Sequence, residues 1–217
     1  MKRLPSFATQ RSILGISLIE VLVSLVILSL GVLAVVALQL VAKRNNADAG
    51  QRTIAAQLAY DMLERMRANC APARLNEYRT ADNSPLGRGS LSAPSQNCAS
   101  ADCTTAQLVT YDRWQWEQTL DGAAEKKGTA NTGGLVLPTA CISGPAGGGD
   151  GLYTVTIVWR GTVGIPPEFS GVATDATRQG CGRNLQIGGE FVYGDGGNND
   201  RLRRSVSVPS FITARTT

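Results

Sequence analysis

The sequence predicts an α+β protein in which one long N-terminal helix precedes a small antiparallel β-sheet. Residues 16–42 are almost entirely apolar, and residues 43–68 repeat apolar side chains at helical spacing. The second half of the chain is rich in Gly, Ser, Thr and Asn and contains segments in which apolar and polar side chains alternate, which is typical of strands joined by loops. A helix that is apolar on one face only needs a folded partner, so we expect its second half to pack on the sheet.

The apolar segment from Ile16 to Ala42 predicts a membrane anchor. At about 1.5 Å per residue, a helix of this length exceeds the roughly 30 Å hydrocarbon core of a bilayer. A secretory signal has an apolar core of only about 7–15 residues, whereas this segment is longer and holds a single charge, Glu20. The segment is preceded by three basic residues, Lys2, Arg3 and Arg11, and by no acidic residue. We therefore expect the N-terminus to stay in the cytoplasm, the apolar segment to cross the membrane once, and the domain that follows to lie on the other side.

The helical pattern continues beyond the apolar segment. Its expected buried face consists of apolar side chains three or four positions apart: Ile54, Ala55, Leu58, Ala59, Met62, Leu63 and Met66. No proline occurs between Ile16 and Ala71. We therefore expect one continuous helix of about 50 residues, roughly 80 Å long.

The region after this helix is expected to be a connection. Residues 71–105 are rich in Pro, Asn, Ser and Gly, which predicts an irregular segment, and residues 111–120 predict a short helical or extended piece. Trp114 and Trp116 lie two positions apart and would share one face of a strand, where packing in the core is the default interpretation.

The strands are expected in the last third of the chain. Residues 152–160 alternate, with Tyr153, Val155, Ile157 and Trp159 on one face. Residues 190–193 and 202–208 repeat the pattern more weakly, so we expect an antiparallel sheet of three or four strands.

The composition argues against several classes of function. The chain has no histidine, which removes the commonest general base and zinc ligand and makes a Ser-His-Asp triad impossible. The net charge of +4 falls to +1 when the first fifteen residues are removed, because 18 basic and 17 acidic residues then remain. A chain so close to neutrality has little reason to bind nucleic acid, and Arg201, Arg203 and Arg204 are interpreted as solvated or paired with acids. The oxygen-rich run at 194–200 lacks the spacing of a calcium loop and is interpreted as a hairpin turn, so we expect no catalytic site, no metal and no cofactor.

Five cysteines follow the apolar segment, and their irregular spacing favours disulfides in an oxidising compartment. Cys141 and Cys181 flank the best strand and its following loop, so an antiparallel return of the chain can bring them together. Cys98 and Cys103 enclose a four-residue loop that can close locally, which leaves Cys70 as the free thiol. The alternative is a bridge from Cys70 to Cys98 or Cys103.

One motif at the start of the apolar segment carries functional information. It reads Gly15-Ile16-Ser17-Leu18-Ile19-Glu20-Val21-Leu22-Val23. The motif resembles the processing site of type IV prepilins and type II secretion pseudopilins, which share a short basic leader, a glycine at the cut, a glutamate five residues into the mature chain and a following apolar helix. Ile16 stands where phenylalanine is commonest and residues 12–14 are uncharged, so we expect slower cleavage.

A second, looser resemblance concerns the rest of the chain. Its residues are Cys98, Cys103-Thr104, Tyr111-Asp112, Trp114, Trp116, Leu137-Pro138, Tyr153-Thr154-Val155 and Trp159. They look like the PilV-type minor pilins, and this resemblance also supports the Cys98–Cys103 bridge.

These resemblances imply a type IV pilin-like fold and a non-enzymatic function. Residues 1–15 would be a leader removed by the prepilin peptidase, residues 16–42 the transmembrane and assembly helix, residues 43–69 its amphipathic continuation, and residues 70–217 a periplasmic β-rich domain. Ile16 would be N-methylated, and Glu20 would pair with the positive N-terminus of a neighbouring subunit.

The function implied is that of a minor pilin that primes or caps type IV pilus assembly and thereby serves twitching motility and adhesion. Its partners would be other minor pilins, the major pilin, the inner-membrane assembly platform and an adhesin at the pilus tip. It would reside in the bacterial inner membrane until it enters the pilus.

Three other interpretations compete with a minor pilin. A type II secretion pseudopilin has the same helix, although the smaller pseudopilins carry a smaller domain with fewer cysteines. A membrane-anchored enzyme would have only carboxylates for acid–base chemistry. A single-pass receptor would need no cut at Gly15.

Overall fold

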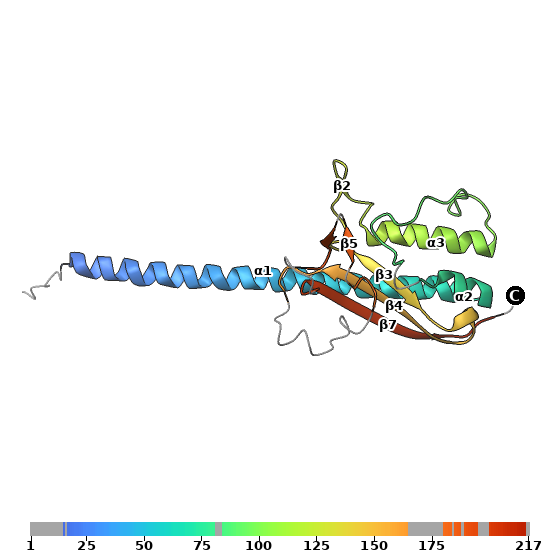
Figure 1. Ribbon diagram of the computed structural model, residues 1–217. Helices are drawn as coiled ribbons and strands as arrows, with labels where there is room; N and C mark the ends of the chain where they lie inside the picture. Colours follow the sequence, from blue (N-terminus) through green and yellow to red (C-terminus); the bar gives the residue numbers. More distant parts are fainter. Residues whose placement is uncertain are drawn as a thin grey trace, which may run out of the picture. The chain divides into compact units, whose positions relative to one another are not determined.

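The computed structural model describes residues 15, 17–80, 84–164, 180–183, 185–187, 189–194 and 200–215. Its contacts divide the chain into two compact units, which meet between Asn45 and Asn46. The boundary falls inside the first helix, α1, which runs from Leu18 to Ala68 and is 51 residues long (Figure 1). The continuous helix expected from the sequence is therefore confirmed, and it begins two residues after Ile16.

The first unit contains the apolar half of α1. This stretch includes an 18-residue window of mean hydropathy 3.0, none of which is buried, so the helix is long and apolar enough to cross a membrane. No proline or cluster of polar residues interrupts this stretch of α1. An uninterrupted helix of leucine, valine and isoleucine suits a bilayer, because all of its backbone N–H and C=O groups are hydrogen-bonded within the helix.

The second unit contains the amphipathic half of α1. Its buried face consists of Ala55, Leu58, Ala59, Met62, Leu63 and Met66. Ile54, which the sequence placed on this face, is instead 38% exposed. Four residues make more than one turn of 3.6 residues, so the row of i, i+4 positions drifts around the helix and leaves Ile54 beyond the edge of the buried face.

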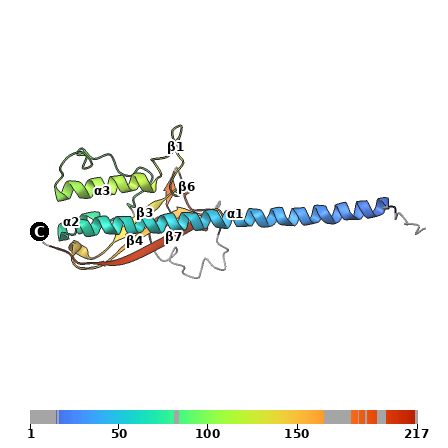
Figure 2. The ribbon, with the colours of Figure 1, turned by 180° about the vertical axis from the view of Figure 1, so that it is seen from behind.

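A three-stranded antiparallel sheet packs on this half of α1 (Figure 2). The strands lie in the order β3 (Thr139–Ser143), β4 (Gly151–Arg160) and β7 (Arg203–Ile212). Ile157 of β4 lies opposite Ala140 of β3 and Val206 of β7, and this register turns the alternate side chains of β4 toward α1. The predicted faces of β4 and the predicted antiparallel sheet are confirmed.

One expected strand does not join this sheet. Glu190–Phe191 is strand β6, which pairs with β5 (Gln186–Ile187) in a separate two-stranded ladder. The third position in the main sheet belongs to β3, which the sequence analysis did not predict. β3 is buried over four of its five residues, and such a short, two-sided apolar strand has no alternation to reveal it.

The segment between α1 and the sheet is more helical than expected. Helix α2 (Pro72–Tyr78) starts with a proline in its first turn, and helix α3 (Thr105–Leu120) is longer than the short piece predicted there. Thr104 and Gln107 form a capping box at the start of α3, a local signal that fixes its first turn.

The two tryptophans of α3 do not share a face, because residues two apart on a helix point in nearly opposite directions. Trp116 is fully buried, whereas Trp114 is half-buried. The remaining elements are short: strands β1 (Lys126–Lys127) and β2 (Ala130–Asn131) form a hairpin, and a 3-10 turn covers Ala146–Gly148.

Both faces of the sheet are covered. On the face toward α1, the core joins α1, α2 and α3 with β4 side chains such as Tyr153 and Trp159. On the opposite face a second, smaller cluster consists of Cys141, Val158, Cys181, Val192 and Tyr193. β4 is therefore the central element of the globular unit.

Candidate assembly helix and its globular unit

The predicted processing site lies just before α1. Gly15 is exposed, and a Cβ atom added to it would meet no heavy atom within 4 Å. Ile16 lies outside the described residues. The carbonyl oxygen of Ser17 accepts hydrogen bonds from the amide nitrogens of Glu20 (3.0 Å) and Val21 (3.3 Å), so the helical ladder starts directly after the predicted cut.

Glu20 lies in the first turn of α1 with an exposed side chain. It is the only charged residue between Gly15 and Ala42. A carboxylate near the N-terminus of a helix is favoured by the helix dipole, which explains why the charge does not prevent helix formation here. Within the described residues, Glu20 forms no ion pair.

The apolar residues that surround Glu20 are also exposed. Every large aliphatic side chain from Leu18 to Val41 has at least 45% of its surface exposed. Soluble proteins rarely expose a contiguous apolar surface of this kind, and its presence indicates a lipid or protein environment around the helix.

A partly buried ionic network joins the three helices of the globular unit. Asp112 of α3 accepts a hydrogen bond from the Tyr78 hydroxyl (2.6 Å) and one from Arg65 of α1 (3.1 Å). Arg65 also donates to Gln115 (2.9 Å) and pairs with Asp61 (3.0 Å). Burial, reinforced by the hydrogen bond to the Asp112 carboxylate, raises the pKa of Tyr78, so the phenol stays protonated and donates.

Two carboxylates four residues apart, Glu117 in the last turn of α3 and Asp121 directly after its end, hold the loop that follows α2. Glu117 is fully buried and accepts hydrogen bonds from the amide nitrogens of Gly87 (2.7 Å), Ser90 (2.9 Å) and Leu91 (2.8 Å), and from the Ser90 hydroxyl. Asp121 accepts from two further amides of this loop at 2.7 and 2.8 Å. Burial raises the pKa of Asp121, and the two amide hydrogen bonds oppose this shift.

Gly87 is required in this loop. Its φ is +117°, and a Cβ atom there would lie 2.5 Å from the carbonyl oxygen of Pro138. Leu86, the residue directly before Gly87, forms an antiparallel β-bridge with Ala140 of β3. The carboxylates of Glu117 and Asp121 therefore position the outer edge of the sheet.

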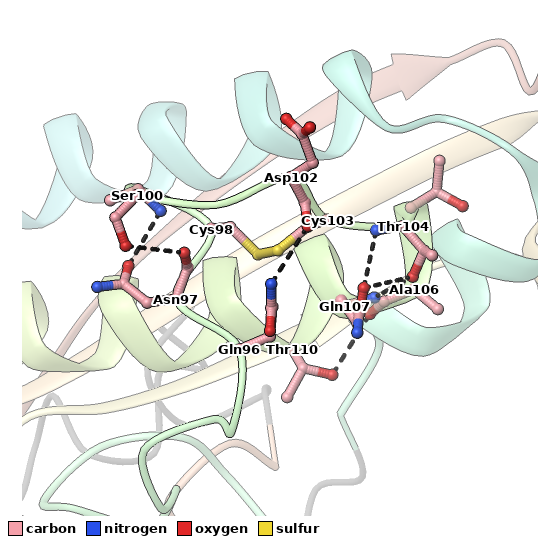
Figure 3. Close-up of a disulfide and its surroundings, with 12 residues drawn as sticks. Gln96, Asn97, Cys98, Ser100, Asp102, Cys103, Thr104, Ala106, Gln107 and Thr110 are labelled. Atoms are coloured by element: carbon pink, nitrogen blue, oxygen red, sulfur yellow. Dashed lines mark hydrogen bonds between the residues drawn. A yellow bond between two sulfur atoms is a disulfide. The ribbon is translucent and has the colours of Figure 1, made fainter.

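Two disulfides and one thiol account for the five cysteines. Cys98–Cys103 closes a short loop directly before the capping box of α3, where the Thr104 amide donates to Gln107 at 2.9 Å (Figure 3). Cys141–Cys181 ties β3 to the segment that covers the second face of the sheet. These are the pairs that the sequence analysis put forward, and Cys70 is the free thiol, partly buried at the end of α1.

Two arginines strengthen the cover of the second face. Arg203 is buried and donates to the Cys181 carbonyl oxygen, and burial lowers the pKa of its guanidinium. Arg160 donates to the carbonyl oxygens of Val192 (3.2 Å) and Gly194 (3.4 Å). Arg203 is thus a structural residue and has no surface with which to contact nucleic acid.

The structure offers no metal site among the residues it describes, since no three Cys, Asp or Glu side chains converge there. The oxygen-rich run considered for calcium lies mostly at 195–199, outside the described residues. The structural roles of Glu117 and Asp121 were not predicted from the sequence, although the capping-box pattern of Thr104 and Gln107 could have indicated a helix with both carboxylates on one face.

Comparison with known families adds an independent observation. The family model described as Type IV pilin Tt1218 matches residues 37–114, which comprise the second half of α1, all of α2 and more than half of α3. Over these residues the chain is similar to type IV pilins. No curated protein and no solved structure matches it.

This pilin-like assignment agrees with the arrangement of a long, initially apolar helix before a small antiparallel sheet. The matched region starts after the processing motif of residues 15–23. The family match and the motif are therefore two separate indications of a pilin, because they come from different parts of the chain. Type IV pilins are structural proteins, and an N-terminal apolar helix fits a pilin anchored in a membrane.

Proposed function

We propose that this chain is a minor pilin of the PilV type, which is cleaved after Gly15 and takes part in type IV pilus assembly. The observation that carries the proposal is Glu20, a single carboxylate on the exposed apolar surface of α1 at the fifth position after the predicted cut. A charge in hydrocarbon is costly and usually has a partner or a function.

Cleavage after Gly15 would create that partner. The new amine of Ile16 on one subunit can pair with Glu20 of a neighbouring subunit, and the low dielectric of an apolar helix bundle makes the attraction strong. An unpaired Glu20 would be costly in the same environment. The pairing would therefore select assembled subunits over isolated ones. N-methylation of Ile16 would keep the amine positively charged.

The proposed location follows from the same helix. Residues 16–42 would cross the inner membrane once, with the leader in the cytoplasm and the globular unit in the periplasm. An oxidising periplasm suits the two disulfides. The proposed partners are the prepilin peptidase, the assembly platform, other minor pilins, the major pilin and an adhesin at the tip.

The decisive experiment is mass spectrometry of the N-terminus after expression of the full chain in cells that contain the prepilin peptidase. The expected first residue is N-methylated Ile16. A chain that keeps its leader in those cells would contradict the proposal and favour a plain membrane anchor. A peptidase-deficient strain provides the control, because the leader should be retained there.

A second measurement separates a minor pilin from a secretion pseudopilin. Sheared and purified pili should contain the chain in small amounts relative to the major pilin. Processing without any recovery in pili, together with loss of protein secretion when the gene is deleted, would assign the chain to a secretion system instead.

A further inference from the structure

A cavity of about 550 Å³ lies beside the loop that follows α2. Its walls come from residues 88–89 of this loop, from Gln118 and Asp121 at the end of α3, and from residues 131–138. All of these residues belong to the unit that starts at Asn46, so the cavity lies entirely within the globular unit. Its volume falls in the range of about 300–1,000 Å³ that is typical of small-molecule sites.

Arg88 brings a positive charge to the cavity, and this charge forms no ion pair with any residue that the structure describes. The Nε and Nη1 atoms are buried and have no hydrogen-bond partner. Nη2 likewise forms no hydrogen bond with the described residues, but it is not a buried atom, so it is the nitrogen that a ligand can reach. Because the rest of the guanidinium is removed from water, an acceptor at Nη2 would be stabilised by a charge-assisted hydrogen bond.

Asp121 brings a negative charge to the same cavity. Within the described part of the chain its carboxylate forms no ion pair, either with Arg88 or with another base. Its two oxygens each accept one backbone amide, from Arg88 at 2.7 Å and from Gly89 at 2.8 Å. An ionised carboxylate has about four acceptor positions, so about two remain for a ligand. The lining therefore contains two opposite charges that do not bind each other.

The fold holds this part of the lining in place. The five backbone amides of residues 87–91 all donate to Glu117 or Asp121. Arg88 and Leu137, which both line the cavity, have left-handed backbones with φ of +63° and +48°. Such conformations are costly outside glycine and gather at ligand sites. A site that is already ordered loses less conformational entropy when a ligand binds.

The remaining lining supplies neutral polar groups and an apolar wall. The side-chain amides of Gln118 and Asn131 form no hydrogen bonds with the described residues, so their donors and acceptors are available. Val136 and Leu137 are 45% and 39% exposed. These two side chains offer apolar surface to whatever occupies the cavity.

We propose that this cavity binds a free amino acid with an apolar side chain. The α-carboxylate would accept a hydrogen bond from Arg88, and the α-ammonium would donate to Asp121. The side chain would lie against Val136 and Leu137. A simple anion would be repelled by Asp121 and a simple cation by Arg88, whereas a zwitterion satisfies both.

The strength of the contacts also favours a zwitterion over a sugar. Hydrogen bonds between charged groups are about twice as strong as those between neutral groups, so the hydroxyl groups of an uncharged ligand would gain less from Arg88 and Asp121. The inference goes beyond the proposed function, because it gives a filament subunit a small-molecule site.

The test is isothermal titration calorimetry of the full chain at neutral pH in micelles of an uncharged detergent. The probes are L-leucine, N-acetyl-L-leucine, which lacks the ammonium, L-leucinamide, which lacks the carboxylate, and glucose. We expect saturable binding of leucine. Each blocked derivative loses one charged hydrogen bond and should bind about tenfold more weakly or worse. Glucose should not bind at the concentrations that saturate leucine binding.

Two variants test the role of each charge. R88Q should weaken leucine binding about tenfold or more but strengthen leucinamide binding, because the charge that repels the ammonium is gone. D121N should weaken leucine binding but strengthen N-acetylleucine binding, for the corresponding reason. Loss of the fold cannot produce these gains. R183Q is the matched control: it removes an exposed guanidinium outside the cavity lining and should bind leucine like the parent.

Several outcomes would overturn the inference. No saturable binding of leucine by the folded parent, or equal binding by the parent and R88Q, would show that the cavity is not an amino-acid site. Equal binding of N-acetylleucine and leucine would show a site for anions, and equal binding of glucose a site for hydroxyl groups. Because binding in micelles needs neither cleavage nor pilus assembly, a negative result here leaves the proposed pilin function standing, and the reverse also holds.

Discussion

Removal of the Cys141–Cys181 bridge should destabilise the globular unit about twice as strongly as removal of the Cys98–Cys103 bridge. In the chain-entropy model a cross-link stabilises by restricting the unfolded chain, and the effect grows with the length of the closed loop. The two bridges span sequence separations of 40 and 5 residues. These lengths correspond to about 4 and about 2 kcal/mol at 25 °C.

The assay compares two double variants, Cys141→Ala/Cys181→Ala and Cys98→Ala/Cys103→Ala, in the same detergent. A domain of this size loses about 2–4 °C in Tm per kcal/mol. We therefore expect Tm to fall by about 8–16 °C for the first variant and about 4–8 °C for the second. Cys141 and Cys181 are also buried in the smaller core, so loss of their packing adds to the first effect. Equal losses of Tm, or a larger loss for the short loop, would refute this reasoning.

The remaining predictions concern single residues. Gly15→Val should block removal of the leader, because the branched side chain crowds the scissile bond while nothing in the chain itself lies near it; a mature-sized product on a denaturing gel would place the cut elsewhere. Glu20→Ala should improve membrane insertion by up to about 2.5 kcal/mol but lower incorporation into sheared pili, and unchanged incorporation would rule out the pairing role. Burial raises the pKa of Asp121, so the folded state binds this proton more tightly than the unfolded state, and its contribution to stability falls as the pH rises from the unfolded pKa of about 3.9 through the folded pKa. Asp121→Asn should remove this loss of stability. The midpoint of urea unfolding should therefore fall with rising pH more steeply in the parent than in the variant over that range. Equal slopes would show that Asp121 does not titrate as expected.

The parts of the fold with a repeating pattern could be predicted from the sequence. α1 is long and free of proline, and β4 alternates between apolar residues and threonine from Tyr153 to Ile157, so local spacing alone identifies both. β3 could not be found in this way, because it is short and buried on both faces. Ile54 shows a different limit: its residue type fits the buried face, but only the path of the helix against the sheet decides which edge positions are covered.

The functional residues divide in the same manner. The proposed processing motif and Glu20 lie within a few residues of one another, so local sequence is enough to propose them. The contacts of Asp112, Glu117 and Asp121 depend on loops and helices about 25 to 50 residues away. Their partners are mostly backbone amides, which carry no sequence signal.

The two covers of the sheet differ in how they form. The cover provided by α1 consists of apolar packing around a helix that forms from local contacts. The opposite cover depends on the bond between Cys141 and Cys181 and on Arg203 and Arg160, which donate to the carbonyl oxygens of Cys181, Val192 and Gly194. In a newly made chain whose cysteines are still reduced, the side of the sheet that faces α1 can therefore pack. The opposite side can pack fully only after the Cys141–Cys181 disulfide has formed. The globular unit would then fold in two steps. The second step, formation of the Cys141–Cys181 disulfide, would take place only after the chain has left the reducing side of the membrane.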